Sequence, residues 1–486
     1  MRNLFLIILA ILVAFSQYVT YRVAGKDGIR PIYWATVINP SYRGYADKYL
    51  AWRKSKGLPE EAISIDVNSF GMQKTLVQGV SGVAADVIDA HNEMPYYREV
   101  GLIENLDQWP EVAGPVRKNL ESFPWMSNAF LGTGNLYCIP TRYHTQFLLL
   151  NLDTLKHYGI KTPPFVTSLD EFERIAREFT DKANAGKAHR EAYFCANIPF
   201  NTLFHSSGIS IFNETGTGMS SFDPKRQALM DRYRRWMYED HLIPTPAEMA
   251  SFSVEYAGLS AAFSIFYKGQ FAALFGGRYV AIFMRQLPKP AAMGGMLVPH
   301  GGYPVVDITY GGLTLYRGSH IKERALGFMK WCTSLDFAKA VVASSDALPP
   351  FPQVFDDEEL LRPSKWTNEW DFHRHFVEVI RSNYVCSPDE SPYLIGSQMN
   401  VWNKGLEAWT IRAVDAATAW SNSQAFVMKD ISVNLNRRPE WRAKFARSVE
   451  NQKKIDAIKE AGGKIPLALV ENPYLRQYYK DMGRGE

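Results

Sequence analysis

The residues that could perform chemistry are dispersed along this chain and form no complete catalytic motif. The sequence contains no G-x-S-x-G, no H-E-x-x-H, no G-x-x-x-x-G-K-[ST] and no full G-x-G-x-x-G. Two Gly-Thr-Gly segments, 132–134 and 216–218, lack the third glycine and the preceding strand of a dinucleotide-binding turn, and are typical of plain turns. The pattern favours binding over catalysis.

Isolated polar pairs have simple structural interpretations. His373 and His375 point in different directions on a helix and would not chelate one ion, so we expect them to be solvated. The acidic run 356–359 suits the start of a helix. Asp86 and Asp89 could suggest a glycosidase, but Asp86 is expected inside a strand and Asp89 at its tip, and the sequence does not identify a second carboxylate about 5–10 Å away, as that chemistry requires. We predict no catalytic residue, no metal site and no cofactor.

Composition limits the class of protein. The 486 residues are 46% hydrophobic and 21% charged, which is typical of globular domains rather than disordered or fibrous chains. Basic residues exceed acidic ones by only four (54 − 50), so we expect no nucleic-acid partner. The 12 Trp and 25 Tyr residues favour either surfaces that stack on sugar rings or an aromatic core, and composition leaves both open.

The first segment is typical of an export signal. Arg2 precedes an uninterrupted apolar run, 4–15, and an Ala-Phe-Ser sequence places small residues before a cleavage at Gln17. A membrane-spanning helix needs about 20 apolar residues. We expect residues 1–21 to be a cleaved signal peptide or, as the alternative, an uncleaved N-terminal anchor. The rest of the chain then lies in the periplasm or on the outer face of the cytoplasmic membrane.

The cysteines are Cys138, Cys195, Cys332 and Cys386, and their wide spacings match no metal-binding pattern. A chain of this length builds a core without cross-links. We expect four small buried hydrophobic side chains, although an oxidising compartment would permit one disulfide.

The residues up to 95 predict alternating strands and helices. Strands are expected at 32–38, 62–67 and 85–89, and helices at 42–55 and 75–80. This order implies an open parallel sheet with helices on both faces. Ligands of such sheets bind beyond the carboxyl ends of the strands, so the loops 33–42 and 89–95 are expected to face a ligand.

The later residues predict further elements of both kinds. Strands are expected at 147–150, 271–275 and 308–315, and helices at 153–158, 261–268 and 442–460. Ser168 with Glu171, and Ser421 with Gln424, form capping boxes at two helix starts. Five apolar residues are expected to share one helix face: Leu406, Trp409, Ala413, Ala416 and Trp420.

Four segments, in order, resemble one known family. Residues 85–107 contain a predicted strand followed by G-L-I, and residues 137–172 contain Y-x-I-P, P-P and D-E-F. Residues 266–273 read F-x-x-G-Q-x-A-A, and residues 311–349 contain G-G and L-P. On these segments the chain resembles the family 1 extracellular solute-binding proteins of ABC importers, the carbohydrate-binding group. The chain departs from the family pattern at two places. The family has tyrosine where this chain has Leu150, and it has tryptophan around the position of residues 277–279. It also extends past about residue 440, beyond the family's ordinary end.

The resemblance implies an α/β, two-lobed periplasmic-binding-protein-like fold. Each lobe would be a mostly parallel sheet flanked by helices, with the ligand cleft between the lobes. Lobe 1 is expected at 27–145 plus 275–312, and lobe 2 at 146–274 plus 313–470. The implied function is capture of a mono- or oligosaccharide and its delivery to ABC permease subunits by a monomer. A binding protein for a non-sugar solute and a secreted carbohydrate-active enzyme are the alternatives.

The expected ligand contacts combine three kinds of residue. Aromatic side chains at predicted loops or strand ends would stack on sugar rings, polar side chains nearby would bind hydroxyl groups, and glycines would let the backbone approach the ligand. A core position or a plain turn is the alternative for each. The ten residues are Trp34, His91, Asn92, Trp125, Arg142, Tyr143, Gly277, Arg278, Tyr310 and Gly311.

Overall fold

The computed structural model describes residues 29–67, 71–91, 93–123, 130–131, 134–252, 261–382 and 384–486, together with residues 11 and 14. The chain divides into two units. The first comprises the chain up to Thr141 and Gly311–Ala340, and the second comprises Arg142–Tyr310 and Val341–Glu486. Among the described residues, no helix has the length and apolar character needed to cross a membrane. The predicted cleavage before Gln17 lies outside the described residues.

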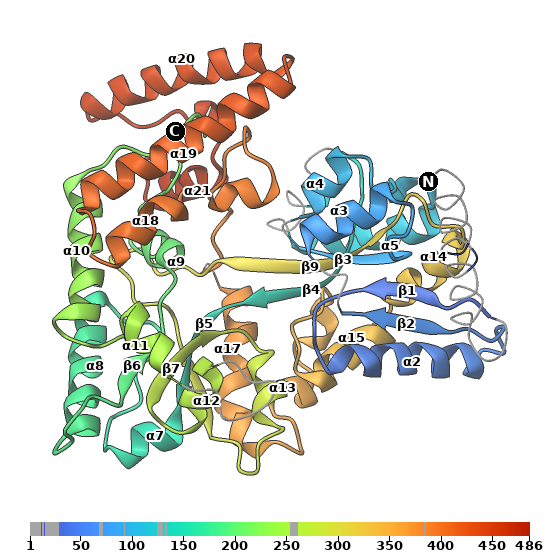
Figure 1. Ribbon diagram of the computed structural model, residues 1–486, viewed down its shortest axis with the longest axis horizontal. Helices are drawn as coiled ribbons and strands as arrows, with labels where there is room; N and C mark the ends of the chain where they lie inside the picture. Colours follow the sequence, from blue (N-terminus) through green and yellow to red (C-terminus); the bar gives the residue numbers. More distant parts are fainter. Residues whose placement is uncertain are drawn as a thin grey trace. The chain divides into compact units, whose positions relative to one another are not determined.

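A five-stranded sheet, in the order β2-β1-β3-β9-β4, is central to the first unit (Figure 1). Its strands are β1 (Ile32–Ala35), β2 (Ile63–Asp66), β3 (Val87–Ala90), β4 (Ile139–Thr145) and β9 (Ile308–Leu315). β1 runs parallel to β2 and β3, which confirms the predicted strand–helix–strand order. β9 is antiparallel to β3, with Gly312 opposite Ala90.

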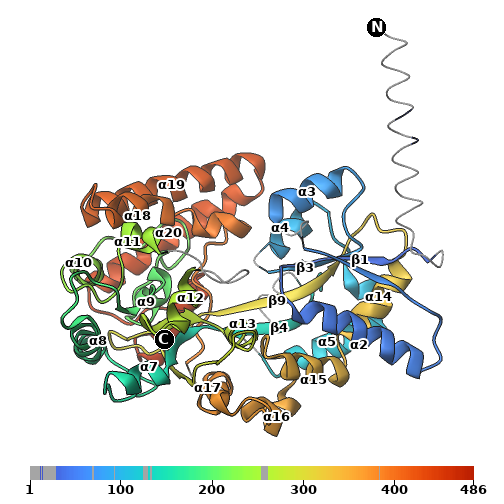
Figure 2. The same cartoon turned by 60° about the horizontal axis from the view of Figure 1, so that its bottom comes forward.

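Helices cover both faces of this sheet; α3 and α4 lie on the opposite side from α2 (Figures 1 and 2). The helices are α2 (Ser41–Ser55), α3 (Met72–Val80), α4 (Met94–Glu99), α5 (Pro110–Leu120), α14 (Lys322–Trp331) and α15 (Leu335–Ser344), whose end belongs to the second unit. α2 buries Tyr42, Tyr45 and Tyr49, a spacing of three and four residues that gives the helix one apolar face. This face packs on α14 through Phe328.

A four-stranded sheet, in the order β6-β7-β5-β8, forms the centre of the second unit. Its strands are β5 (Phe147–Asn151), β6 (Tyr193–Cys195), β7 (Phe271–Gly276) and β8 (Met293–Met296). β5 is antiparallel to β7 and β8, and β6 is parallel to β7. Nearly every residue of the four strands is buried, as expected for a sheet covered on both faces.

The division of the chain differs from the expected lobes in two long segments and at residues 142–145, which were expected in the first lobe but belong to the second unit. Residues 275–310 were expected in the first lobe but belong to the second unit, because β8 pairs with β5. Residues 313–340 were expected in the second lobe but belong to the first unit, because β9 pairs with β3 and α14 packs on α2.

Thirteen described helices lie in the second unit, and α18, α19 and α20 are grouped together (Figure 1). They are α7 (Leu152–His157), α8 (Leu169–Asn184), α9 (Phe200–His205), α10 (Pro224–Tyr238), α11 (Pro246–Ser251), α12 (Ala261–Tyr267), α13 (Val280–Met284), α16 (Glu358–Leu361), α17 (Trp370–Arg381), α18 (Asn403–Thr410), α19 (Ala416–Arg437), α20 (Trp441–Glu460) and α21 (Pro473–Asp481). The expected helix at 442–460 is confirmed as α20.

Helix starts in this unit follow the capping rules only in part. Ser168 accepts a hydrogen bond from the Glu171 backbone N–H at 3.2 Å, as predicted, but the Glu171 carboxylate binds Arg174. The predicted capping box at Ser421 is wrong, because α19 begins earlier, where Asp415 accepts from the Thr418 N–H. The chain also breaks between α18 and α19, so residues 406–420 do not form one helix face, and Ala413 is exposed.

The last helices add a small second core to this unit. Ile455, Val470 and Tyr474 pack there against Tyr303 and Val305, which lie just before β9. All four cysteines of the chain are buried thiols in the structure, without a disulfide among them. The prediction of small buried side chains is therefore confirmed.

Candidate functional site

The carboxyl ends of β1 and β3 carry a polar group in the first unit, which we call the first-sheet edge: Thr36, Asp89, His91 and Glu93. Asp89 is fully buried, and one of its oxygens accepts a hydrogen bond from the Thr36 hydroxyl at 2.7 Å. The Glu93 carboxylate accepts from the His91 backbone N–H at 3.1 Å. The half-buried His91 therefore lies at the edge that the strand order predicted for a ligand.

Trp34 belongs to the core of the first unit and not to this edge. Its side chain is 1% exposed, and its ring centroid lies 5.2 Å from those of Tyr42 and Phe328. The alternation of β1 directs Trp34 to the face that α2 covers. The expectation that Trp34 stacks on a sugar is therefore corrected: it is a core residue.

The equivalent carboxyl end of β7 carries a half-buried aromatic group in the second unit, which we call the second-sheet edge: Tyr279, His144 and Gln146. Phe147 of β5 lies opposite Gly276 of β7, so the residues before β5 lie beside those after β7. The Gln146 side-chain amide donates to the Tyr279 hydroxyl at 3.5 Å, and the His144 ring lies edge-on, 6.0 Å from the Tyr279 ring centroid.

A glycine at position 277 permits this arrangement. A Cβ there would lie 2.9 Å from the Tyr279 ring and 3.3 Å from the Thr145 carbonyl oxygen. Gly277 is buried, so its role is to let the tyrosine ring fold back over the turn. Burial raises the pKa of Tyr279, so the phenol stays neutral and can both donate and accept a hydrogen bond.

Arg278 lies next to this edge in sequence but is directed into the protein. Its guanidinium donates to the carbonyl oxygens of Val342 at 2.9 Å, Ala347 at 3.0 Å and Val341 at 3.4 Å. These carbonyls lie in or just after the last turn of α15, where Ser345 N–H and the Ser344 hydroxyl also donate to the Val342 and Val341 oxygens, so the guanidinium adds a second donor to those two and supplies one to Ala347. Arg278 is 1% exposed and closes a helix end, so its assignment as a ligand contact is corrected.

Arg278 continues into a buried network on α17. Its Nε donates to Nδ1 of His373 at 3.1 Å, and Nε2 of His373 donates to the Glu369 carboxylate at 2.6 Å. Arg285 binds the same carboxylate through two nitrogens, at 2.8 and 2.7 Å. Burial and the Arg278 charge lower the pKa of His373 to about 4. Burial opposes ionisation of Glu369, but His373 and Arg285 outweigh it and lower the pKa.

The expectation that His373 and His375 are solvated is therefore wrong. His373 is fully buried, and His375 is 8% exposed and stacks on Phe165 with 4.2 Å between ring centroids. The acidic run behaves as predicted, because Asp357 caps α16 by accepting from the Glu359 backbone N–H.

The other expected contacts also divide between core and edge. Arg142 and Tyr143 on β4 are both 0% exposed, and Arg142 Nε lies 3.8 Å from the buried Asp346, so neither presents a surface to a ligand. Tyr310 is half-buried on β9, and Gly311, at the next position, is buried. Asn92 and Trp125 lie outside the described residues.

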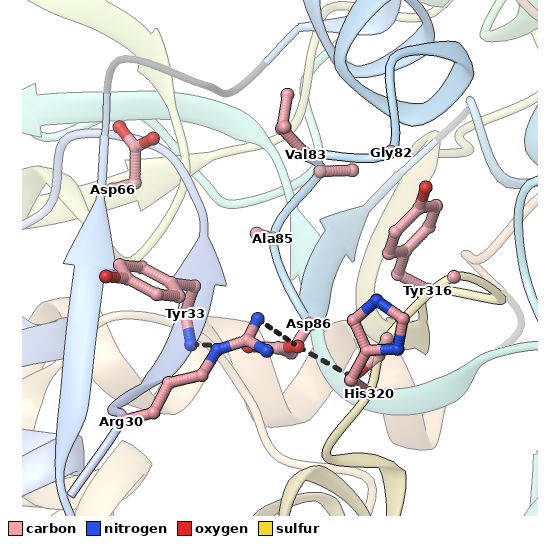
Figure 3. A pocket seen from close by; sticks show the side chains of 12 residues that line it. Arg30, Tyr33, Asp66, Gly82, Val83, Ala85, Asp86, Tyr316 and His320 are labelled. Carbon is pink, nitrogen blue, oxygen red and sulfur yellow. Dashed lines mark hydrogen bonds and ion pairs between the residues drawn. The ribbon is translucent and has the colours of Figure 1, made fainter. Parts of the chain in front are cut away.

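Three cavities in the described part of the chain are lined by none of the eight described contacts. One, of about 490 Å³, lies in the first unit at the amino ends of β1 and β3, where Arg30 and Tyr33 face Tyr316 and His320 (Figure 3). Its floor is Asp86, which accepts from the Ser319 hydroxyl at 2.6 Å and the Tyr33 backbone N–H at 3.0 Å. Two others, of about 400 and 600 Å³, lie in the second unit.

Sequence reasoning missed Tyr279, although a signal was present. The departure from the family pattern at 277–279 marks the position where the family has an aromatic residue, and Tyr279 is the aromatic residue of that triplet. An aromatic ring beside an amide and an imidazole can stack on an apolar ring face and exchange hydrogen bonds with hydroxyl groups. The second-sheet edge thus has the side chains for binding a polar ring compound.

Comparison with known proteins identifies a family and a fold. The sequence profile of the bacterial extracellular solute-binding protein family matches residues 41–338. Among curated proteins, none matches the chain. Three solved structures illustrate the likeness, which at these identities shows the fold alone.

An ABC substrate-binding protein of Listeria monocytogenes, in complex with cycloalternan, is 17% identical with a TM-score of 0.64, and the match covers 82% of this chain and 98% of that one. The GacH receptor of Streptomyces glaucescens, solved unliganded and with acarbose, is 16% identical with a TM-score of 0.64, covering 83% and 98%. A maltose/maltodextrin-binding domain of Bdellovibrio bacteriovorus, bound to maltotriose, is 15% identical with a TM-score of 0.62, covering 82% and 99%. The predicted periplasmic-binding-protein-like fold is confirmed, but the sheet of the second unit is mostly antiparallel and not mostly parallel as expected.

Proposed function

The chain belongs to the bacterial extracellular solute-binding protein family, and from this premise we propose that it captures a mono- or oligosaccharide outside the cytoplasmic membrane for an ABC importer. In this proposal the exported protein works as a monomer and delivers the sugar to the permease subunits in the membrane. It catalyses no reaction.

The observation that carries the proposal is the second-sheet edge. Tyr279 is half-buried at the carboxyl end of β7, and the planar side chains of His144 and Gln146 lie beside it. Sugars present apolar C–H faces and a rim of hydroxyl groups, so an aromatic ring with neighbouring hydrogen-bonding groups suits them. The structural neighbours named above have oligosaccharides or an oligosaccharide-like inhibitor in their descriptions, which supports the same ligand class.

The carboxylates of the first unit favour binding over glycoside hydrolysis. Asp86 precedes β3 and accepts hydrogen bonds from Ser319 and Tyr33, whereas Asp89 lies near the end of β3 and accepts from Thr36. Both carboxylates are buried and accept hydrogen bonds from different groups of the protein, which is typical of structural carboxylates. A hydrolase needs two carboxylates about 5–10 Å apart on either side of that bond.

Calorimetric titration of the purified protein tests the proposal. The panel comprises glucose, maltose, maltotriose and a cyclic α-glucan, with a polyol phosphate and a peptide as non-sugar ligands. We expect saturable binding of at least one sugar, and no released product in a parallel hydrolysis assay. Binding of the polyol phosphate or the peptide alone, or turnover of a sugar, would contradict the proposal.

Variants of Tyr279 locate the site. Loss of a stacked ring is worth about 1–1.5 kcal/mol, so Tyr279→Ala should weaken sugar binding roughly 5–10-fold. Tyr279→Phe keeps the ring and should retain most of the affinity. Tyr33→Ala removes a half-buried tyrosine from the cavity of Figure 3 and serves as the matched control with wild-type affinity. Equal losses in Tyr279→Ala and Tyr33→Ala would remove the second-sheet edge from the site.

His91→Ala tests the contribution of the first-sheet edge. His91 is half-buried at the first-sheet edge, so the melting temperature of the variant is measured together with its sugar affinity. A reduced sugar affinity in a variant that melts like the wild type would place His91 in the site. An unchanged affinity would exclude it.

A further inference from the structure

Three potential metal ligands of different chemical type meet inside the second unit: His205, Asp307 and Cys386. His205 is the last residue of α9, Asp307 precedes β9, and Cys386 follows α17. One nitrogen, one carboxylate oxygen and the sulfur lie within 4.8 Å of one another. Nothing in the proposed sugar binding uses this group, which we call the HDC cluster.

The distances within the HDC cluster converge on one oxygen. Nδ1 of His205 lies 2.7 Å from Oδ1 of Asp307, and Sγ of Cys386 lies 3.1 Å from the same oxygen. Ligand atoms of a tetrahedral zinc site are about 3.3–3.8 Å apart, given zinc–ligand bonds of about 2.0–2.3 Å. An ion between them would therefore require Oδ1 of Asp307 to move about half an ångström away from both Nδ1 and Sγ.

Neighbouring residues hold His205 and Asp307 of the HDC cluster through the nitrogen or oxygen that does not face the cluster. Nε2 of His205 faces the buried Asp389 carboxylate at 3.0 Å, which leaves Nδ1 directed at the cluster. Oδ2 of Asp307 accepts hydrogen bonds from the Thr202 hydroxyl at 2.6 Å and the Asn201 amide at 3.0 Å, which leaves Oδ1 for the cluster. A carboxylate behind a histidine and hydrogen bonds behind a carboxylate are the usual outer shell of a protein metal site.

Asp389 is itself held in place by the last part of the chain. The Asn472 amide, at the start of α21, donates to it at 2.7 Å, and the Ser210 hydroxyl donates at 2.9 Å. The His205 ring also packs on Tyr474 with 4.5 Å between ring centroids. The direction of the imidazole is thus fixed from both sides, as a rigid ligand set requires.

We propose that the HDC cluster is a zinc site, with His205 Nδ1, Asp307 Oδ1 and Cys386 Sγ as protein ligands and water in the fourth position. Sulfur with nitrogen favours zinc over magnesium or calcium, which take oxygen ligands. One thiolate and one carboxylate balance the two charges of the ion. The protons that now bridge Nδ1 and Sγ to Oδ1 leave to solvent as the metal binds.

The site has a route to solvent. The Asp307 side chain is 24% exposed, whereas His205 is 5% exposed. Metal would therefore enter from the Asp307 side, where the water ligand would also be placed. The ion would join α9, the segment before β9 and the segment after α17, and the expected consequence is a higher melting temperature with zinc bound.

Calorimetric titration of tag-free, metal-stripped full-length protein with zinc chloride tests the site. We expect one zinc per chain and a rise in melting temperature, with magnesium chloride giving neither. In Cys386→Ser the hydroxyl still donates to Asp307, so the apo protein should fold, but zinc affinity should fall by more than about 100-fold, since even outer-shell partners are worth about 10–100-fold. Cys195→Ser, at another buried cysteine, is the matched control with wild-type affinity.

Cobalt provides a readout that depends on no variant. The cobalt-substituted wild type should show the near-ultraviolet band of thiolate-to-metal charge transfer, and Cys195→Ser should keep it. A cobalt complex without that band, a wild type that binds no stoichiometric zinc, or a Cys386→Ser variant that binds zinc like the wild type would each overturn the proposal. Sugar binding is measured separately, so failure of the zinc site leaves the proposed function untouched.

Discussion

Protonation of His373 should destabilise the protein in mildly acidic solution. The pKa of this histidine falls from 6.5 to about 4 in the folded chain, because burial and Arg278 oppose a second positive charge. Above pH 6.5 the ring is neutral in both the folded and the unfolded state, so this histidine does not reduce the free energy of unfolding. Between pH 6.5 and about pH 4 only the unfolded state takes up the proton, so stability falls as the pH falls. At 1.36 kcal/mol per pKa unit the total loss is about 3 kcal/mol.

His373→Gln isolates this contribution. A glutamine side chain can accept from Arg278 and donate to Glu369 but does not titrate, so the variant should lose stability less steeply over the same pH range. The measurement is the melting temperature of wild type and variant across that range by calorimetry. His189→Gln changes an exposed histidine and should leave the wild-type pH dependence intact.

Direct titration of the ring provides the decisive result. In protein with labelled histidine, the NMR signal that is absent from His373→Gln should remain that of a neutral ring down to pH values well below 6.5. A signal that titrates at an ordinary histidine pKa, or identical pH slopes for wild type and His373→Gln, would refute the argument that burial and Arg278 keep this ring neutral.

Substitutions at two further residues separate core residues from ligand contacts. Trp34→Ala should cost about 3–5 kcal/mol of stability, measured by denaturant unfolding, because it empties the space between Tyr42 and Phe328; a stable variant with weakened sugar binding would return Trp34 to the site. Arg278→Met removes the guanidinium from the Ala347 carbonyl and from Nδ1 of His373, and takes one of two donors from Val341 and Val342, so it should cost about 3 kcal/mol. Arg278→Lys should not restore the stability, since one ammonium group cannot reach all the acceptors that the guanidinium binds. Both Arg278 variants, where folded, should keep the wild-type sugar affinity.

Six of the nine described strands were predictable because their signals are local, whereas β4, β6 and β8 were not predicted. The strand at 32–35 is β-branched and aromatic, and the helix at 41–55 repeats tyrosine at three and four residues. The break between α18 and α19 was not predictable from apolar spacing, because the residues on both sides keep the helical pattern while Asp415 starts a new helix by capping it.

The side-chain roles depended on partners far away in sequence. Arg278 binds carbonyls 63–69 residues later, and nothing near it indicates that its charge is already occupied. The HDC cluster joins His205 to Asp307 across 102 residues and Asp307 to Cys386 across 79, so wide cysteine spacing concealed the convergence. Tyr279 was within reach of sequence reasoning, because it lies in the triplet that departs from the family pattern.

The insertion of Gly311–Ala340 into the span of the second unit has a consequence for the newly made chain. The first unit has all of its residues once Ala340 has been synthesised, whereas the second unit must wait for the end of the chain. There the Leu467 N–H donates to the Glu486 carbonyl oxygen, and Tyr474 completes the second core. Since chains fold from the amino end as they emerge, β5 is made long before α17, whose Phe376 packs on Phe147 of that strand. A chain that stops before α21 should therefore depend on chaperones, or be degraded, even though every residue matched by the family profile is present.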